Sequence, residues 1–189
     1  MANLTAPLDA ATGQQIGALL QRLRTSKDVG ADLLQVLDIA IGIAGADMGT
    51  LQRLDERTDC LTIVASRGFS SEALTFFGIV RRGTNTTCAA ALTRRMRVFV
   101  EDVSTSYLFV GTRDLDMLHA GGIAAAQSTP LISSNGRLWG VLTTHFHKPQ
   151  IESEFDHAPL DRLAVQVADS LERREGLSPW QEDRIRRLT

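Results

Sequence analysis

Apolar residues recur at helical spacing near both ends of the chain. The pattern predicts one helix from about Ala10 to Arg24 and a second over Val29–Ala44, with Asp28 as its N-cap and Gly45 as its stop. A third, long helix is predicted toward the C-terminal end. The apolar positions of the three helices are Ile16, Leu19, Leu20 and Leu23, then Leu33, Leu37, Ala40, Ile41 and Ala44, then Leu160, Leu163, Val167 and Leu171.

A capping pattern suggests where the third helix begins. Ser153 and Asp156 are spaced as in a capping box, with Asp in place of the usual Glu. We therefore expect the helix to open there and to run to about Arg174.

Two predicted hairpins lie between the helices. The first joins Met48–Leu54 to Cys60–Ser66, and alternation places Leu61, Ile63 and Ala65 of its second strand on one face. The second joins Ile123–Ile132 to Leu138–His147 through an Asn-Gly turn, which is the strongest short-range hairpin signal. Both faces of the second hairpin carry apolar residues, so we expect both to be covered.

Shorter elements complete the prediction. Val98–Val100 is typical of a buried strand, and short helices are expected after Ser70, from Thr84 or Thr86 to Arg95, and over Arg113–His119. The fold class predicted is α/β (α+β): a central antiparallel sheet with the terminal helices on one face and short helices and loops on the other. We divide the chain into an N-terminal helix (1–27), a domain (28–175) and a tail (176–189).

Composition narrows the class of protein. With 189 residues, 43% hydrophobic and 22% charged, the chain has the balance of a globular domain. It contains no apolar run of the roughly 20 residues that cross a bilayer, and its start does not resemble a signal peptide. A net charge of −2 gives no field for nucleic acid, and two distant cysteines make a poor disulfide framework. We expect a cytoplasmic protein without membrane or direct nucleic-acid contacts.

An ordered set of segments resembles GAF domains, in particular those of bacterial signalling proteins and phytochromes. The set covers about Asp28 to Arg174 and comprises Leu33–Ala40 with Ala46–Gly49, Arg67-Gly68-Phe69, Arg97–Val103 and Leu138-Trp139-Gly140. The resemblance implies a GAF-like fold and a non-catalytic sensory role. A structural GAF domain that binds nothing remains an alternative.

Known GAF subtypes do not match. The Asn-Lys and Phe/Asp-Glu signature of cyclic-nucleotide binders is not reproduced by His147-Lys148 and Phe155-Asp156. Bilin attachment is not expected, because no cysteine stands near Asp116. Two distant cysteines do not match the reactive set of free methionine sulfoxide reductases. The cofactor or ligand therefore stays unknown.

Candidate ligand-binding residues gather around the second hairpin. The resemblance points to His145 of this hairpin and to His119 of the helix before it. Polar Gln127, Thr129 and Thr143 also lie on the two strands of the hairpin. Small residues at Ala124–Ala126 would leave room for a pocket beneath the Leu115–His119 helix. Two alternatives remain open: a helix could pack closely on this strand and leave no pocket, and His145 could be a half-exposed residue at a strand end.

Other chemistry has weaker support. Cys88, near a helix N-terminus, could have a lowered pKa and serve a small thiol-dependent reductase, although free cysteines are usually buried and inert. His145 and His147 are too few ligands for a metal, and His119 is a more natural helix-end residue than a haem ligand.

The terminal helices suggest assembly and output. Leu19, Leu23 and Leu171 are expected to be partly available for a partner, which predicts a homodimer. The tail from Gly176 to Arg187 resembles the segment before an AraC-type helix-turn-helix domain, which would make the chain the sensory part of a transcription regulator.

Overall fold

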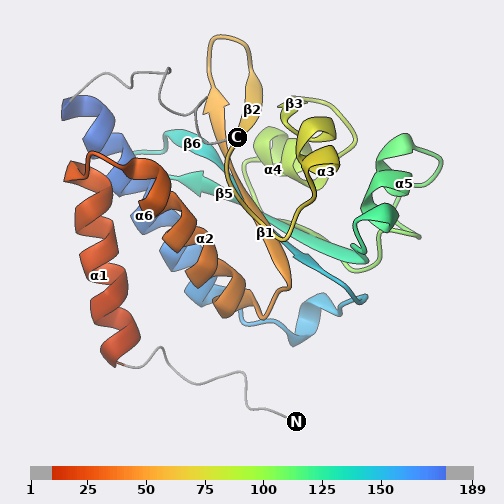
Figure 1. Cartoon of the computed structure of the whole chain (residues 1–189), viewed down its shortest axis with the longest axis horizontal. Coiled ribbons are helices and arrows are strands. Elements are labelled where there is room, and N and C mark those ends of the chain that lie inside the picture. The colour runs from red at the N-terminus through yellow and green to blue at the C-terminus, as the bar shows by residue number, and fades with distance from the viewer. Residues whose placement is uncertain (1–9, 178–189) are drawn as a thin grey trace.

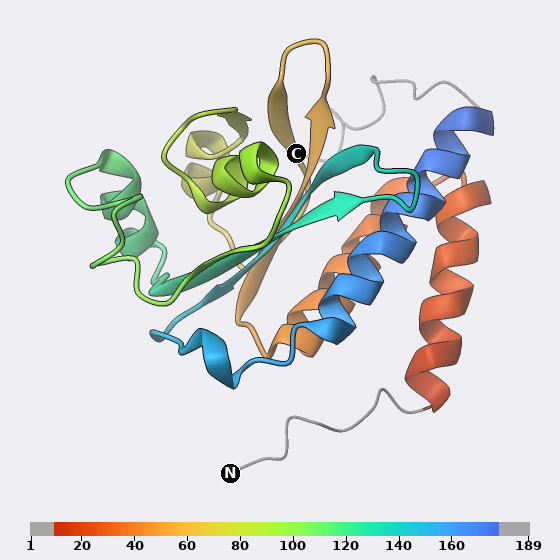
Figure 2. The ribbon, with the colours of Figure 1, turned by 180° about the vertical axis from the view of Figure 1, so that it is seen from behind.

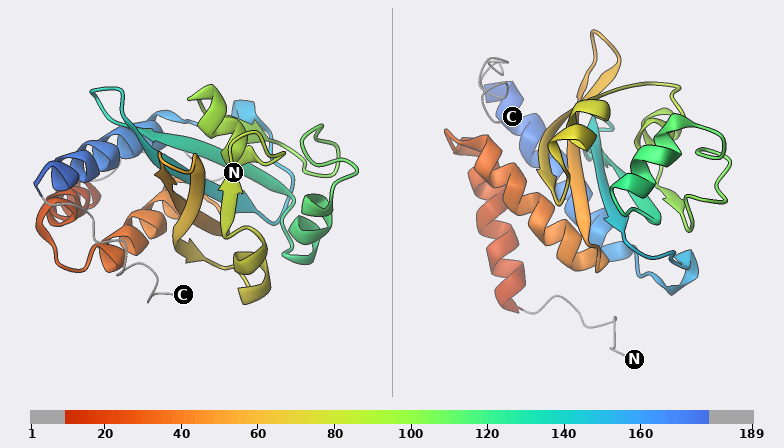
Figure 3. Two further views of the ribbon diagram at one scale, coloured as in Figure 1. Left: turned by 90° about the horizontal axis from the view of Figure 1, so that it is seen from above. Right: turned by 45° about the vertical axis from the view of Figure 1, so that its right-hand side comes forward.

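A six-stranded antiparallel sheet separates two unlike layers of helices (Figures 1 and 3). The structure, a computed structural model, describes residues 10–177. The strand order is β3-β2-β1-β6-β5-β4. The strands are β1 (Met48–Asp55), β2 (Cys60–Arg67), β3 (Ile79–Arg81), β4 (Val98–Val100), β5 (Ala125–Ile132) and β6 (Leu138–Phe146). The predicted fold class and both hairpins are confirmed.

Three long helices cover one side of the sheet, which we call the helix face (Figure 2). They are α1 (Ala10–Thr25), α2 (Val29–Ala44) and α6 (Ala158–Leu177). The ends of α2 follow the sequence signals. Asp28 accepts a hydrogen bond from the Ala31 N–H, and Gly45 has a φ of 61°, in the left-handed region.

The start predicted for the last helix is wrong. Ser153 lies in a 3-10 turn, η1 (Glu152–Glu154), and α6 begins only at Ala158. Proline lacks an N–H and is tolerated only in the first turn of a helix, so a helix opened at Ser153 would break at Pro159. Phe155 instead has an extended backbone and packs its ring against Phe146, 5.6 Å between centroids.

Short helices and loops cover the other side, which we call the loop face (Figure 1). The helices are α3 (Ser71–Phe76), α4 (Thr87–Arg94) and α5 (Arg113–Ala120). Each follows a hydroxyl residue, Ser70, Thr86 or Thr112, whose side chain accepts a hydrogen bond from a first-turn N–H. These local caps explain why such short segments are helical at all.

A β-bulge corrects the predicted facing of β2. Leu51 pairs with Ala65, but the next residue of β1, Gln52, pairs with Ile63, so Val64 is the extra residue. Ala65 therefore packs into the helix-face core, whereas Leu61 packs on the loop face. Strict alternation had placed these residues together.

The apolar stripe expected to meet a partner is inside the chain. Leu19 is 1% exposed and Leu23 and Leu171 are 0% exposed, all within the helix-face core. The reason is that α1 packs on α2 and α6, where Arg24 Nε lies 3.4 Å from Ser170 Oγ and Arg174 Nη1 donates to the Ser26 carbonyl at 2.7 Å. The prediction that these leucines are available for dimerisation is wrong. The AraC-like tail from Ser178 onward lies outside the described residues.

The Leu138-Trp139-Gly140 segment ties β6 to its neighbours. The Trp139 indole N–H donates to Glu175 Oε1 of α6 at 3.0 Å. A Cβ at Gly140 would lie 2.0 Å from the carbonyl oxygen of Gln52, so β1 can approach β6 this closely only beside glycine.

Candidate functional site

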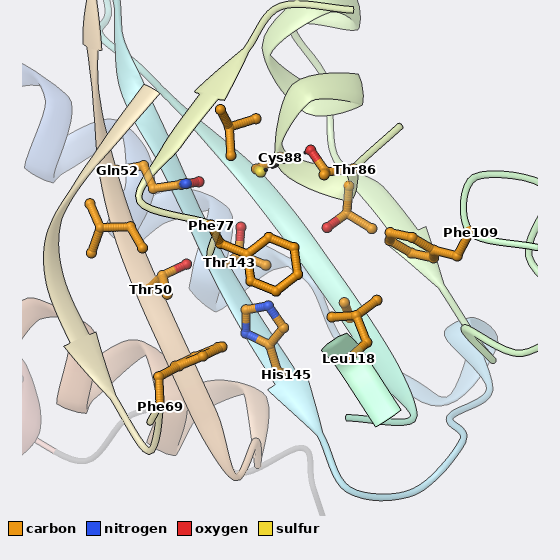
Figure 4. Close-up of a pocket in the computed structure, with 14 residues that line it drawn as sticks. Thr50, Gln52, Phe69, Phe77, Thr86, Cys88, Phe109, Leu118, Thr143 and His145 are labelled. Atoms are coloured by element: carbon orange, nitrogen blue, oxygen red, sulfur yellow. Dashed lines mark hydrogen bonds between the residues drawn. The ribbon is translucent and has the colours of Figure 1, made fainter. Parts of the chain in front are cut away.

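A small cavity lies on the loop face, between the centre of the sheet and its cover (Figure 4). Its volume is about 40 Å³. On this measure a water needs roughly 10–15 Å³, so the cavity has room for about three waters. Strands β1, β2, β5 and β6 form its floor, and Phe77, Phe109 and Leu118 come from the cover.

His145 projects from β6 into this region. It is 8% exposed, and its ring meets Phe69 edge-on with 5.0 Å between centroids. Burial lowers the pKa of His145 to about 3, because the apolar surroundings disfavour the imidazolium. Its Nδ1 has no hydrogen-bond partner among the described residues. The half-exposed position kept open as an alternative for His145 is wrong; the side chain is neutral and enclosed.

Gln52 reaches the cavity from β1. The residue is 2% exposed and lines the cavity together with Cys88. Its Oε1 is buried and, within residues 10–177, has no hydrogen-bond partner. Leaving such an acceptor unsatisfied costs about 1–3 kcal/mol. Sequence analysis missed Gln52, although alternation from Met48 through Thr50 places a polar side chain on the same face.

Cys88 lies in the first turn of α4. Its Sγ is 3.2 Å from Thr86 Oγ1, the hydroxyl that also caps the helix. The pKa of the Cys88 thiol is raised, because burial outweighs these hydrogen bonds. The lowered pKa considered from the sequence is therefore wrong, and the thiol is protonated at neutral pH.

The structure brings together three of the six predicted site residues. Cys88, Thr143 and His145 line the cavity, and Leu118 of the predicted covering helix does so as well. Thr143 Oγ1 lies 2.8 Å from Ser128 Oγ, which positions its hydroxyl.

The other three predicted residues lie elsewhere. Gln127 and Thr129 alternate with the cavity residue Ala126 on β5, so their buried side chains point to the helix face. Thr129 pairs with Leu142 and Gln127 with Thr144, both helix-face positions. His119 is exposed, with Nε2 3.1 Å from Ser104 Oγ. Including all three in the pocket was wrong. Polar character alone does not reveal which face a strand residue occupies, and His119 is an exposed residue near the end of α5.

The cavity carries no formal charge. Of the fourteen residues drawn around it in Figure 4, none is a Lys, Arg, Asp or Glu, and its histidine and thiol are both neutral. Among the described residues no group of three His, Cys, Asp or Glu is placed to hold a metal ion. In the same part of the chain, no helix is long and apolar enough to cross a membrane. The site can exclude water and offer hydrogen bonds, but it contains no charged catalytic group.

Solved structures share this architecture. The GAF domain of an Acinetobacter phosphoenolpyruvate-protein phosphotransferase is 17% identical, with a TM-score of 0.67, and the match covers 94% of this chain and 98% of that one. The free methionine-R-sulfoxide reductase of Neisseria meningitidis, in complex with its substrate, is 18% identical, with a TM-score of 0.66 and coverage of 94% and 99%. The GAF domain of A. aeolicus nlh2 in an inactive state is 16% identical, with a TM-score of 0.63 and coverage of 86% and 96%.

These identities show the fold alone. No curated protein matches the chain. The model of the GAF domain family, in contrast, matches residues 27–172, which is most of the sequence. The chain therefore belongs to the GAF domain family.

Proposed function

We propose that this chain is a non-catalytic sensory domain that binds a small molecule in the loop-face cavity. GAF domains are sensory and regulatory modules of signalling proteins, which sets the general role. The observation that carries the proposal is that two enclosed side chains lining one cavity, Gln52 and His145, each have a buried polar atom without a partner among the described residues.

A ligand would remove an energetic cost. Buried polar groups in folded proteins are almost always hydrogen-bonded, and each exception needs an explanation. Two such exceptions beside one cavity indicate a site whose partners arrive from outside. Burying a ligand against Phe77, Phe109 and Leu118 would add apolar contact to the restored hydrogen bonds.

Entry to the cavity is expected through the segment that carries α3. Ala73 is the only described residue of α3 that is buried, and Gly68, with a φ of 83°, precedes the segment. Phe77 directly follows α3 and lines the cavity. Displacing this weakly anchored segment would open the site without disturbing the sheet.

A thermal-shift screen of small metabolites tests the proposal. A ligand at 100 times its Kd stabilises the folded state by about 2.7 kcal/mol. Ala126 lines the cavity, so Ala126→Leu should abolish the shift by filling it. Ala31→Leu, on the exposed side of α2, is the matched control and should retain it. A compound that stabilises both variants equally would bind elsewhere and contradict the proposed site.

The non-catalytic part of the proposal rests on the state of Cys88. Its thiol is buried and its pKa is raised, whereas a nucleophilic cysteine needs an accessible thiolate. We expect slow alkylation of Cys88 at pH 7 and no turnover of free methionine-R-sulfoxide with a thiol reductant. Turnover that disappears in Cys88→Ser would favour the reductase alternative.

The homodimer expected from the sequence stays part of the proposal, with a different contact surface. Its interface cannot use Leu19, Leu23 or Leu171, which are enclosed, so it would use the outer sides of α1 and α6. Analytical ultracentrifugation at 10–100 µM tests this assembly, and a monomer throughout would contradict it. The AraC-like tail supports transcription regulation as the output, and the two free thiols support a reducing cytoplasmic setting.

A further inference from the structure

The loop-face cavity has polar groups but no charge with which to bind an ion. Its ionisable members, His145 and Cys88, are both held neutral by burial. The arginines at the end of β3 point outward: Arg81 and the residue after the strand, Arg82, are exposed, and Arg82 pairs with Asp59 at 2.7 Å. An anionic or cationic ligand would therefore lose its hydration without gaining an opposite charge, which is strongly unfavourable.

The two unpartnered groups stand at opposite ends of the cavity floor. In the β1–β6 register Met48 pairs with His145, Thr50 with Thr143 and Gln52 with Val141. Gln52 and His145 are thus four residues apart along two paired strands, roughly 14 Å between Cα atoms. Both side chains extend toward the middle of the cavity (Figure 4). A single small molecule can lie between them.

The middle of the cavity floor carries two threonines, Thr50 and Thr143, which pair across β1 and β6. The Thr143 hydroxyl lies 2.8 Å from Ser128 Oγ, so that group already has a partner within the protein. Phe77 and Leu118 stand opposite the floor. The cavity therefore presents an unpartnered acceptor at one end, an imidazole at the other and, between them, two threonines beneath apolar side chains.

We propose that the ligand of this cavity is a short, uncharged molecule that donates a hydrogen bond to Gln52 Oε1 and makes a second hydrogen bond with His145, with small carboxamides as the simplest class. This inference rests on the proposed function and deepens it. A carboxamide supplies both N–H donors and a carbonyl acceptor, which suits an amide oxygen at one end and either nitrogen of a neutral imidazole at the other. Room for about three waters matches the size of acetamide or propionamide.

Isosteric probes separate charge from shape. The full chain is titrated at pH 7 with acetamide and propionamide, and in parallel with acetate and propionate, which have nearly the same size. Two-dimensional ¹H–¹⁵N spectra follow the backbone amides of β1 and β6 and the imidazole nitrogens of His145. We expect saturable shifts with the amides in the millimolar range, and binding of the acids weaker by at least about tenfold. Equal binding of acids and amides, or no saturation with either amide, would overturn the assignment.

Two glutamines provide a matched pair of variants. Gln52→Met keeps the length of the side chain and removes its amide, and it should weaken propionamide binding by about tenfold or more. Gln127→Met is the control, because Gln127 is equally buried and also has an unpartnered Oε1, but faces the helices. Binding that survives Gln52→Met, or that is lost equally in both variants, would contradict the role of Gln52.

The results distinguish a wrong ligand class from a wrong sensory function. If both amides fail while the metabolite screen yields a ligand that Ala126→Leu abolishes, the ligand class is wrong and the sensory proposal stands. If neither the amides nor the screen yields a ligand that depends on the cavity, both are wrong.

Discussion

The two faces of the sheet are built from the same strands but differ in how tightly they are covered. The helix face is closed by α1, α2 and α6, whose buried leucines form its core. The loop face is covered by short capped helices, of which α3 and α5 each bury a single residue, and it leaves a cavity with partnerless polar atoms. Stability is therefore concentrated on one face, which allows the other to be incompletely packed.

The division runs through single strands. In β1, Leu51 packs among the helices, whereas its neighbours Thr50 and Gln52 line the cavity. In β6, Leu142 belongs to the helix face and Thr143 to the cavity. Any ligand on the loop face thus contacts strands that the helix face holds rigid.

Among single substitutions, the largest effect is expected where the helix face is most tightly packed. Leu23→Ala should cost about 3–5 kcal/mol, because a fully enclosed side chain between three helices leaves a cavity that cannot collapse. Leu118→Ala, at the existing cavity, should cost about 2 kcal/mol or less, because its neighbours can relax. Urea denaturation of both variants measures the difference. Equal losses would mean that the two faces are equally packed.

The same packing changes the outcome of a dimer test. Replacing Leu19 and Leu23 by Glu would bury charges in the core and unfold the chain rather than dissociate a dimer. Circular dichroism distinguishes the two results, since a folded double variant would show that α1 is dispensable for the core.

A second, smaller loss is expected at the contact between β1 and β6. Gly140→Ala places a Cβ 2.0 Å from the Gln52 carbonyl oxygen, and forcing the strands apart should cost about 3 kcal/mol. The control, Gly17→Ala, meets nothing within 4 Å on an exposed helical position and should stabilise by about 0.5–1 kcal/mol. Melting curves of the two variants should shift in opposite directions. A neutral Gly140→Ala would show that the strands are free to separate.

Local signals in the sequence were sufficient for the elements of the fold. Asp28, Gly45 and the Asn-Gly turn each act within a few residues, so helix ends and hairpins followed directly from them. The error at Ser153 came from weighing a capping pattern without the proline six residues later. The error at Ala65 came from a bulge, which depends on how two strands pair and not on either strand alone.

The site was predictable only in part for the same reason. Thr143 and His145 were identified from a strand whose family resemblance was recognised, and alternation then placed both on one face. Gln52 was missed because its importance arises only when β1 pairs with β6, a contact between residues almost 90 positions apart in the chain. Gln127 was chosen for its polarity, which is real, but the face it occupies is set by β5 pairing.

A loss of stability of intermediate size is expected when the pH is lowered. The pKa of His145 is lowered from 6.5 to about 3 in the folded state, so between these values the unfolded chain binds a proton that the folded chain does not. Stability from this group is present above pH 6.5 and is lost as the pH falls toward 3. Between pH 7.5 and 5 the loss should be about 2 kcal/mol. His145→Gln, compared with the unchanged chain by urea denaturation at both pH values, should remove this part of the loss. An unchanged pH dependence in the variant would mean that the imidazole is solvated.

The smallest expected effect bears most directly on the contrast between the faces. Gln52 and Gln127 each carry a buried Oε1 without a partner among residues 10–177, one at the cavity and one beneath the helices. Replacing either by Met removes a poorly satisfied acceptor and keeps the volume, so each variant should be as stable as the unchanged chain or more stable by about 1 kcal/mol. Stability alone therefore does not tell the two positions apart. Ligand binding does. Only Gln52 borders space that a ligand can enter, so only Gln52→Met should lose ligand affinity. If Gln127→Met also lost affinity, the helix face would be coupled to the site, and the separation of the two faces would fail.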